Sequence, residues 1–114
     1  MNAVVATEFP LTLTQRDIYL HQIGYPAAPI YNVGGYVKLG VVDPVRLQRA
    51  HAMLVRAHDA FGIRIVSSEG GTRQRIVGGD ERTLALPIID LSDQPAPAEA
   101  AREKVTRLFE AQTP

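Results

Sequence analysis

Three histidines are the side chains of this chain best suited to acid–base catalysis or metal binding, because imidazole titrates near neutral pH and coordinates metals. His51 and His58 lie seven residues apart on one predicted helix. Two histidines that share a metal ion on a helix normally stand at positions i and i+4, so this spacing predicts structural or polar-flank roles and no metal site. His21 lies near the end of another predicted helix, where a cationic imidazole complements the helix dipole.

Other catalytic groups are equally scarce. The chain has no cysteine, which excludes disulfides, zinc-thiolate sites and thiol nucleophiles. Ser67, Ser68 and Ser92 fall in predicted turns, and none lies in a G-x-S-x-G elbow. The glycine pairs 70–71 and 78–79 lack the flanking residues of a phosphate-binding loop, so turn formation explains them. The residues therefore predict no catalytic nucleophile.

Composition is that of an ordinary globular protein. The 114 residues are 46% hydrophobic and 21% charged, with twelve basic and twelve acidic side chains. A balanced charge gives no electrostatic basis for binding nucleic acid or an anionic membrane. Residues 1–8 have neither the basic nor the apolar segment of a signal peptide. We expect residues 1–114 to form a single unit, soluble and located in the cytoplasm.

The first half of the chain predicts a helix and a strand. Thr12 and Gln15 have capping-box spacing, so a helix is expected from about residue 13 to residue 23, with Gly24 as its left-handed stop. Residues 31–39 alternate between apolar and polar, which is typical of a strand with one buried face. The pair Gly34-Gly35 within it predicts a bulge or a close backbone approach.

Asp43 as N-cap and Pro44 at the first helical position begin a second predicted helix. Its expected buried stripe repeats every three or four residues: Leu47, Ala50, Leu54, Ala57 and Phe61. Residues 62–66 and 73–77 read as a hairpin, because Gly70 and Gly71 can both take the positive φ angles of a tight turn.

A further strand is expected over residues 84–89, at a sheet edge because Pro87 cannot donate a ladder hydrogen bond. After the prolines at 95 and 97 comes a last helix. Its expected buried face is Ala98, Ala101, Val105 and Leu108. The order helix, strand, helix, three strands, helix predicts an α+β fold.

The junction between the second helix and the hairpin resembles a known signature. Residues 57–65, AHDAFGIRI, align with the pattern R-H-x-x-L-R-T-x-F found in condensation domains of nonribosomal peptide synthetases. His58 falls on the pattern's histidine. The chain departs from the pattern at its second arginine, replaced by Gly62, and at its closing phenylalanine, replaced by Ile65.

Two further segments resemble that family in the same order. Residues 9–20 are similar to its opening motif S-x-A-Q-x-R-x-W-x-L, with Tyr19 in place of tryptophan and Arg16 one place early. Residues 31–39 are similar to its Y-N-x-x-x-x-x-x-L strand, which precedes an Asp-Pro-x-x-Leu helix that begins here at Asp43. The resemblance covers residues 9–66. It assigns motif or structural positions to Thr12, Thr14, Gln15, Tyr19, Tyr31, Asn32, His58, Asp59, Phe61, Gly62 and Arg64.

The resemblance implies the N-terminal portion of a condensation domain's N-lobe, similar to chloramphenicol acetyltransferase, with a mixed sheet covered by helices. Complete domains of this family are transferases of secondary metabolism and antibiotic biosynthesis, and they join a carrier-bound acyl or peptidyl thioester to the amine of an aminoacyl thioester. The family's catalytic motif, H-H-x-x-x-D-G, is absent from this sequence. We therefore expect no catalytic residue in the chain and no activity of the chain alone.

The implied partners are peptidyl carrier proteins and adjacent synthetase domains. No cofactor is expected to bind directly, because phosphopantetheine is presented by the carrier protein. The arginines at 64, 73 and 75 are expected on the exposed face of the hairpin, where they could also meet that group or an acidic carrier protein. A lobe without its remaining strands would leave an open sheet edge, so self-association is expected as well.

Some alternatives stay open at this point. In the family, the arginine at position 62 pairs with the motif aspartate, so either Arg64 supplies that charge here or the parent domain has drifted from condensation. The chain could instead be a non-catalytic docking module, or part of a cyclisation, epimerisation or polyketide-associated acyltransferase domain. A downstream D-x-x-x-x-D motif would indicate cyclisation.

Overall fold

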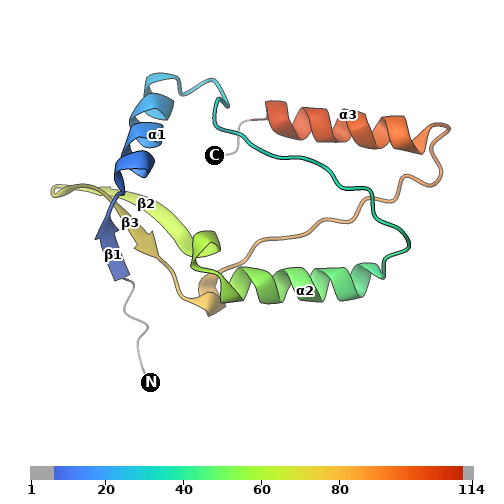
Figure 1. Cartoon of the computed structure of the whole chain (residues 1–114), viewed down its shortest axis with the longest axis horizontal. Helices are drawn as coiled ribbons and strands as arrows, with labels where there is room; N and C mark the ends of the chain where they lie inside the picture. Colours follow the sequence, from blue (N-terminus) through green and yellow to red (C-terminus); the bar gives the residue numbers. More distant parts are fainter. Residues whose placement is uncertain (1–6, 112–114) are drawn as a thin grey trace. The chain divides into compact units, whose positions relative to one another are not determined.

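Residues 7–111 are described by the computed structural model, and they form helices and a small antiparallel sheet, which confirms the predicted α+β class (Figure 1). In chain order the elements are β1 (Thr7–Pro10), α1 (Leu13–Gly24), α2 (Pro44–Ala57), the 3-10 turn η1 (Asp59–Gly62), β2 (Ile63–Ser68), β3 (Gly71–Ile76), the 3-10 turn η2 (Gly79–Glu81) and α3 (Pro97–Glu110).

The chain divides into two compact units, which we describe separately. The first unit comprises Met1–Thr12 and Val41–Pro87, and the second comprises Leu13–Gly40 and Ile88–Pro114. The grouping of residues 1–114 as one portion of a lobe stays a prediction.

The sheet of the first unit has β3 at its centre, with β1 and β2 antiparallel on either side (Figure 1). Strand β1 was not predicted. Its four residues carry no alternation of their own, and they form a strand because their backbone pairs with β3 from Thr7 opposite Ile76 to Pro10 opposite Arg73. The Gln74 side chain adds a hydrogen bond from Nε2 to the Pro10 carbonyl at 3.0 Å.

The predicted hairpin is confirmed as β2 and β3, paired from Ile63 opposite Ile76 to Ser68 opposite Gly71. Gly71 has a φ of 99° and is the one residue in the described range with a positive φ. The expectation that Gly70 would share this conformation was wrong, because one left-handed residue suffices to reverse the chain here.

The predicted arginine cluster lies on one face of the hairpin. Arg64 and Arg75 are direct cross-strand neighbours. Arg73 lies two residues before Arg75 in β3 and therefore on the same face of the strand. Like charges opposite each other destabilise a sheet. Here Arg75 is neutralised by Glu8 of β1, with Nη2 to Oε1 at 2.6 Å, while Arg64 turns back onto backbone carbonyls.

Helix α2 begins as predicted. Oδ1 of Asp43 accepts the backbone N–H of Val45 at 2.9 Å and that of Arg46 at 3.3 Å, and Pro44 takes the first position, where no N–H is needed. The helix ends at His58, whose backbone is extended (φ −113°, ψ 121°).

The predicted buried stripe of α2 was wrong. Val55 lies outside that stripe and is the buried residue, 2% exposed, whereas Leu54 is 47% exposed. Gln48, seven residues before Val55 and on the same side, donates from Nε2 to the Leu86 carbonyl at 3.1 Å. Periodicity groups residues by face, but neighbouring segments decide which face is covered. Phe61 belongs to η1 and is 36% exposed, because the helix has already ended at His58.

In the second unit, α1 matches the predicted helix, although its end differs. Gly24 is the last helical residue and is not left-handed, so its predicted role as a stop was wrong. The turn is closed instead by the Tyr25 N–H, which donates to the Gln22 carbonyl at 3.1 Å, and by Gln22 Nε2, which donates to the Ala28 carbonyl at 2.9 Å.

Helix α3 confirms the predicted last helix, but its expected buried face was wrong in part. Leu108 is 72% exposed, while Ala100, Val105 and Phe109 are half-buried. The helix starts at Pro97 without a side-chain cap.

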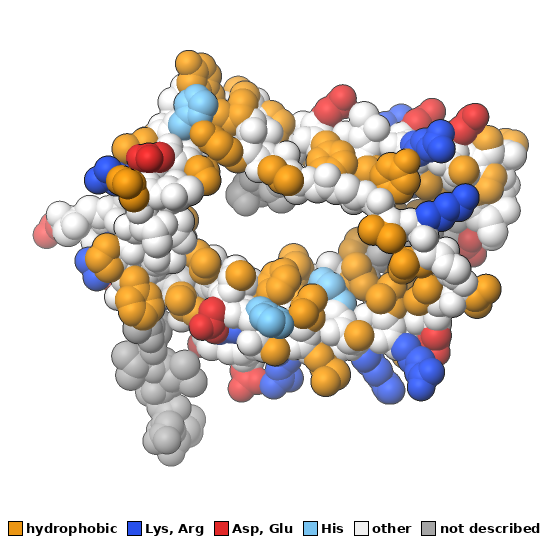
Figure 2. All heavy atoms as spheres, in the orientation of Figure 1, with side chains coloured by type: hydrophobic (Ala, Val, Ile, Leu, Met, Phe, Trp, Pro, Cys, Tyr) orange, Lys and Arg blue, Asp and Glu red, His pale blue; other side chains and the backbone are white. Residues whose placement is uncertain are grey.

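The strands expected over residues 31–39 and 84–89 are not formed in the described part of the chain. Alternation marks a face that can be covered, yet a strand also needs a neighbour for its N–H and C=O groups. Val33 and Val37 are accordingly 96% and 80% exposed. Hydrophobic side chains, orange in Figure 2, are visible on the surface of both units.

Candidate functional site

The helix–strand junction of the first unit brings together His58, Asp59, Phe61 and Gly62. The backbone N–H of His58 donates to the Leu54 carbonyl at 3.2 Å, and its carbonyl accepts the Phe61 N–H at 3.2 Å. His58 thus joins α2 to η1 through its backbone, while its side chain is exposed. The backbone of His58 lies at the end of the helix. A role of its imidazole in holding that end stays a prediction.

Gly62 is buried at the centre of this junction. A Cβ added there would lie 2.6 Å from Nε of Arg82 and 2.8 Å from the carbonyl oxygen of Val77. Both separations are too short for real atoms, so glycine is required by the present packing. Its backbone carbonyl accepts the Val77 N–H at 3.0 Å and extends the β2–β3 ladder by one bond.

Arg82 fills the space above Gly62, and its side chain is 6% exposed. The guanidinium donates in three directions: Nε to the Val77 carbonyl at 2.9 Å, Nη1 to the Arg56 carbonyl at 3.1 Å, and Nη2 to Oδ1 of Asp59 at 2.6 Å. It therefore ties the end of α2, η1 and the segment after β3 together.

Sequence reasoning missed Arg82. The residue follows Asp80 and Glu81 in a polar stretch that reads as a turn, and an arginine is rarely buried unless it is paired. The available signal was Gly62 itself, because a glycine at a packed junction leaves room for a side chain from elsewhere.

Arg64, the residue expected to supply the charge missing at position 62, does not point to that space. Its Nη1 donates to the carbonyls of Phe61 at 3.2 Å and Ile63 at 3.0 Å, and the side chain is exposed.

The motif residues Tyr31 and Asn32 lie in the second unit. The Tyr31 hydroxyl is 2.6 Å from Nδ1 of His21, and the rings of Tyr31 and Tyr25 meet the imidazole edge-on at centroid distances of 5.5 Å and 5.3 Å. His21 lies in the last turn of α1, as predicted. Asn32 Nδ2 donates to the carbonyls of Phe109 and Ala111.

The remaining motif residues flank or belong to α1. Thr12 immediately precedes the helix, and Gln15 and Tyr19 are half-buried one turn apart on the same side. Thr12 and Gln15 both take part in interactions in the structure. The reciprocal capping-box bonds between them stay a prediction.

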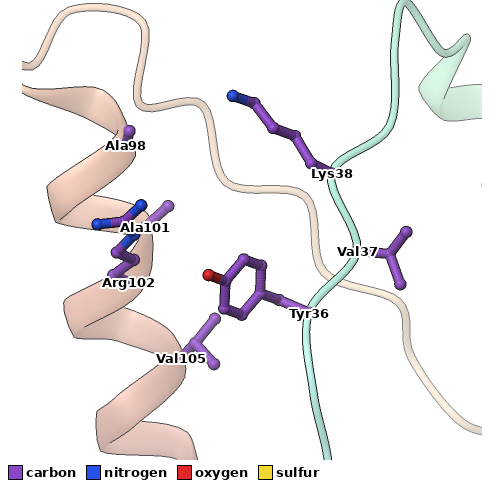
Figure 3. A pocket seen from close by; sticks show the side chains of 7 residues that line it. All are labelled: Tyr36, Val37, Lys38, Ala98, Ala101, Arg102 and Val105. Carbon is purple, nitrogen blue, oxygen red and sulfur yellow. The ribbon is translucent and has the colours of Figure 1, made fainter.

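A cavity of about 310 Å³ in the second unit lies between residues 36–38 and α3. Figure 3 shows the Tyr36 ring directed toward the helix near Val105, whereas Val37 points away from it. Lys38 and Arg102 add two cations to an otherwise mainly apolar lining. The lining holds no carboxylate, histidine or serine, so it can accommodate an apolar or anionic group but offers no acid–base pair.

The described residues contain no group of three or more histidine, cysteine or acidic side chains that could hold a metal ion. Two of the serines are part of the hairpin, with Ser67 Oγ 3.5 Å from Thr72 Oγ1 and Ser68 Oγ donating to the Gly71 carbonyl. Between residues 7 and 111 no helix has the length and apolar character of a membrane-spanning segment.

Known proteins are similar to this chain in sequence and in structure. The sequence profile of the condensation domain family matches residues 5–113. A component of the linear gramicidin synthase of Brevibacillus parabrevis is 30% identical over 110 residues, which make up 96% of this chain and 2% of that protein.

Among solved structures, the starter condensation domain of rhizomide synthetase is 29% identical, with a TM-score of 0.85 over 96% of this chain and 26% of that one. A mutant of that domain in complex with C8-CoA gives a TM-score of 0.84 over 95% of this chain and 24% of that one. The chain thus spans about a quarter of its solved relatives. It belongs to the condensation domain family.

Proposed function

We propose that this chain is the N-terminal portion of a nonribosomal peptide synthetase condensation domain, and that residues 1–114 fold as one part of its N-lobe. The complete domain would form an amide bond between a carrier-bound acyl or peptidyl thioester and the amine of an aminoacyl thioester. One observation carries the proposal: 96% of the chain superposes on a starter condensation domain of which it covers 26%.

Within such a domain the contribution of these residues would be positional. The junction holds the end of α2 against the start of β2 through His58, Gly62 and Arg82. The sequence contains no adjacent histidine pair, so the base that assists amine attack would come from another part of the domain. The chain alone would then be catalytically inactive.

The proposed partners are peptidyl carrier proteins that present phosphopantetheine thioesters, together with neighbouring synthetase domains, in the cytoplasm. Support comes from the similarity to a linear gramicidin synthase and to a starter condensation domain of which a mutant was solved in complex with C8-CoA. We also propose that the isolated chain self-associates through the exposed apolar residues of segment 33–39. A monomer in light scattering at high concentration would contradict self-association alone.

A chimera tests the proposal. Residues 5–113 would replace the matching quarter of the rhizomide starter condensation domain, and condensation activity would be compared with that of the unaltered domain. A folded and active chimera is expected. A chimera that folds but forms no amide, while still binding its carrier protein, would instead favour the non-catalytic docking module.

A further inference from the structure

Gly62 and Arg82 occupy one space between them. The guanidinium group of Arg82 begins 2.6 Å from the point where a side chain at position 62 would start, and the arginine is nearly buried. These residues are twenty positions apart and lie on different segments. The side-chain volume at the junction is therefore filled from the segment after β3 instead of from the junction itself.

We propose that Arg82 supplies the guanidinium of the junction in place of a side chain at position 62, which makes it the positioning residue that fixes Asp59 and the end of α2. Arg64 is the other candidate for this charge, and it donates to the carbonyls of Phe61 and Ile63. Of the two, Arg82 alone has its side chain inside the junction.

The bonds of Arg82 require an arginine. A guanidinium offers five N–H donors in a fixed planar fork, whereas a lysine is a point charge with flexible donors. Here three donors reach a carboxylate and two backbone carbonyls on three different segments.

The cost of losing this group is large because its partners are backbone carbonyls that would lose their donors. The carboxylate of Asp59 is 72% exposed and can return to water, so the ion pair is the smaller part of the effect. The carbonyl oxygens of Val77 and Arg56 lie 2.8 Å and 2.9 Å from a Cβ built at Gly62 and at Gly79, so the backbone packed around them restricts the approach of water.

The experiment moves the arginine side chain from position 82 to position 62 in the 114-residue chain. Arg82→Ser and Gly62→Arg are each expected to lower the urea midpoint by more than about 1 M, the first through lost bonds and the second through overlap. The double variant Gly62→Arg/Arg82→Ser removes the overlap with the guanidinium, although that with the Val77 carbonyl remains, so it is expected to be more stable than either single variant. Arg82→Lys keeps the charge and is expected to behave like Arg82→Ser.

NMR of the arginine Nε–H groups gives a readout that general destabilisation would not produce. The parent should show a slowly exchanging Nε–H resonance assigned to Arg82, more protected than that of Arg75, whose Nε–H donates to Glu8 from a side chain that is 43% exposed. The double variant should show a protected resonance assigned to position 62. The inference is overturned if the double variant is no more stable than Arg82→Ser, or if its arginine at position 62 exchanges as fast as exposed arginines.

A second comparison decides the matter if the exchanged protein does not fold. Gly62→Ala should lower the urea midpoint less in the Arg82→Ser background than in the parent. In that background the overlap of the new Cβ with Nε of Arg82 is absent, and the Val77 carbonyl is no longer fixed by the bond from Arg82. Equal shifts in the two backgrounds would contradict the inference. Neither result bears on condensation activity, so the chimera and this exchange can fail independently.

Discussion

The side chain of Asn32 holds the end of a helix that lies 77 residues further along the chain. Its Nδ2 donates to the Phe109 carbonyl at 3.2 Å and to the Ala111 carbonyl at 3.1 Å. These carbonyls belong to the final turn of α3 and its C-cap, where no intrahelical N–H reaches them. The motif residue Asn32 therefore acts as a remote C-terminal cap in the second unit.

Replacement of Asn32 by aspartate keeps its shape and removes both donors. Asn32→Asp should cost about 1–2 kcal/mol, because two carbonyls lose their partner and face a carboxylate. Hydrogen exchange should accelerate at the last amides of α3. Gln94→Glu makes the same chemical change at an exposed position and is the control. Unchanged exchange at the helix end in Asn32→Asp would show that the cap contributes nothing.

Two adjacent glycines should differ in their response to an added methyl group. A Cβ at Gly34 would lie 2.7 Å from Cζ of Phe109, whereas Gly35 has nothing within 4 Å. Gly34→Ala should destabilise by about 1–3 kcal/mol through overpacking, and Gly35→Ala should change stability by less than about 0.5 kcal/mol. Urea melts of the two variants test the predicted close approach at this pair. Equal midpoints would refute it.

The covered face of α2 can be tested with one buried and one exposed residue of that helix. Val55 is 2% exposed and Met53 is 72% exposed. Val55→Ala should cost about 2 kcal/mol, and Met53→Ala less than about 0.5 kcal/mol. Phe61→Ala should cost about 2 kcal/mol, below the 3–5 kcal/mol typical of a fully buried phenylalanine, because Phe61 is 36% exposed. A loss of about 3–5 kcal/mol for Phe61→Ala, as for a fully buried phenylalanine, would favour the predicted stripe.

Asp90 gives the chain a defined response to acid. Hydrogen bonds from the side chain and then the backbone of Ser92 lower the pKa of Asp90 below its ordinary value of 3.8. A lowered folded-state pKa stabilises the protein above the unfolded value, and this contribution disappears as the pH falls through the lowered pKa. Ser92→Ala should raise the pKa of Asp90 toward 3.8 in an NMR titration. Ser68→Ala, in the hairpin, is the control and should leave it unchanged, while no shift in Ser92→Ala would contradict the assignment.

Local signals predicted the parts of the fold that depend on neighbours in sequence. Asp43 and Pro44 start α2 because a cap needs residues only two or three positions away. Gly71 closes the hairpin for the same reason. Strand β1 was missed because its ladder partner lies more than sixty residues away, in β3.

The same dependence on distant residues limited the prediction of the helix–strand junction. His58, Asp59, Phe61 and Gly62 could be located from their order in the sequence. Arg82 could not, because its burial depends on carbonyls of α2 and of the segment after β3 that only the folded chain brings within reach.

We propose that this chain contributes a positioning junction to a condensation domain and no catalytic group. Mass spectrometry of the isolated chain, incubated with loaded donor and acceptor carrier proteins, tests it most directly. A complete condensation domain assayed with the same carrier proteins is the positive control. We expect no amide product above the rate without enzyme. Product above that rate, lost on substitution of His58 by alanine, would contradict it.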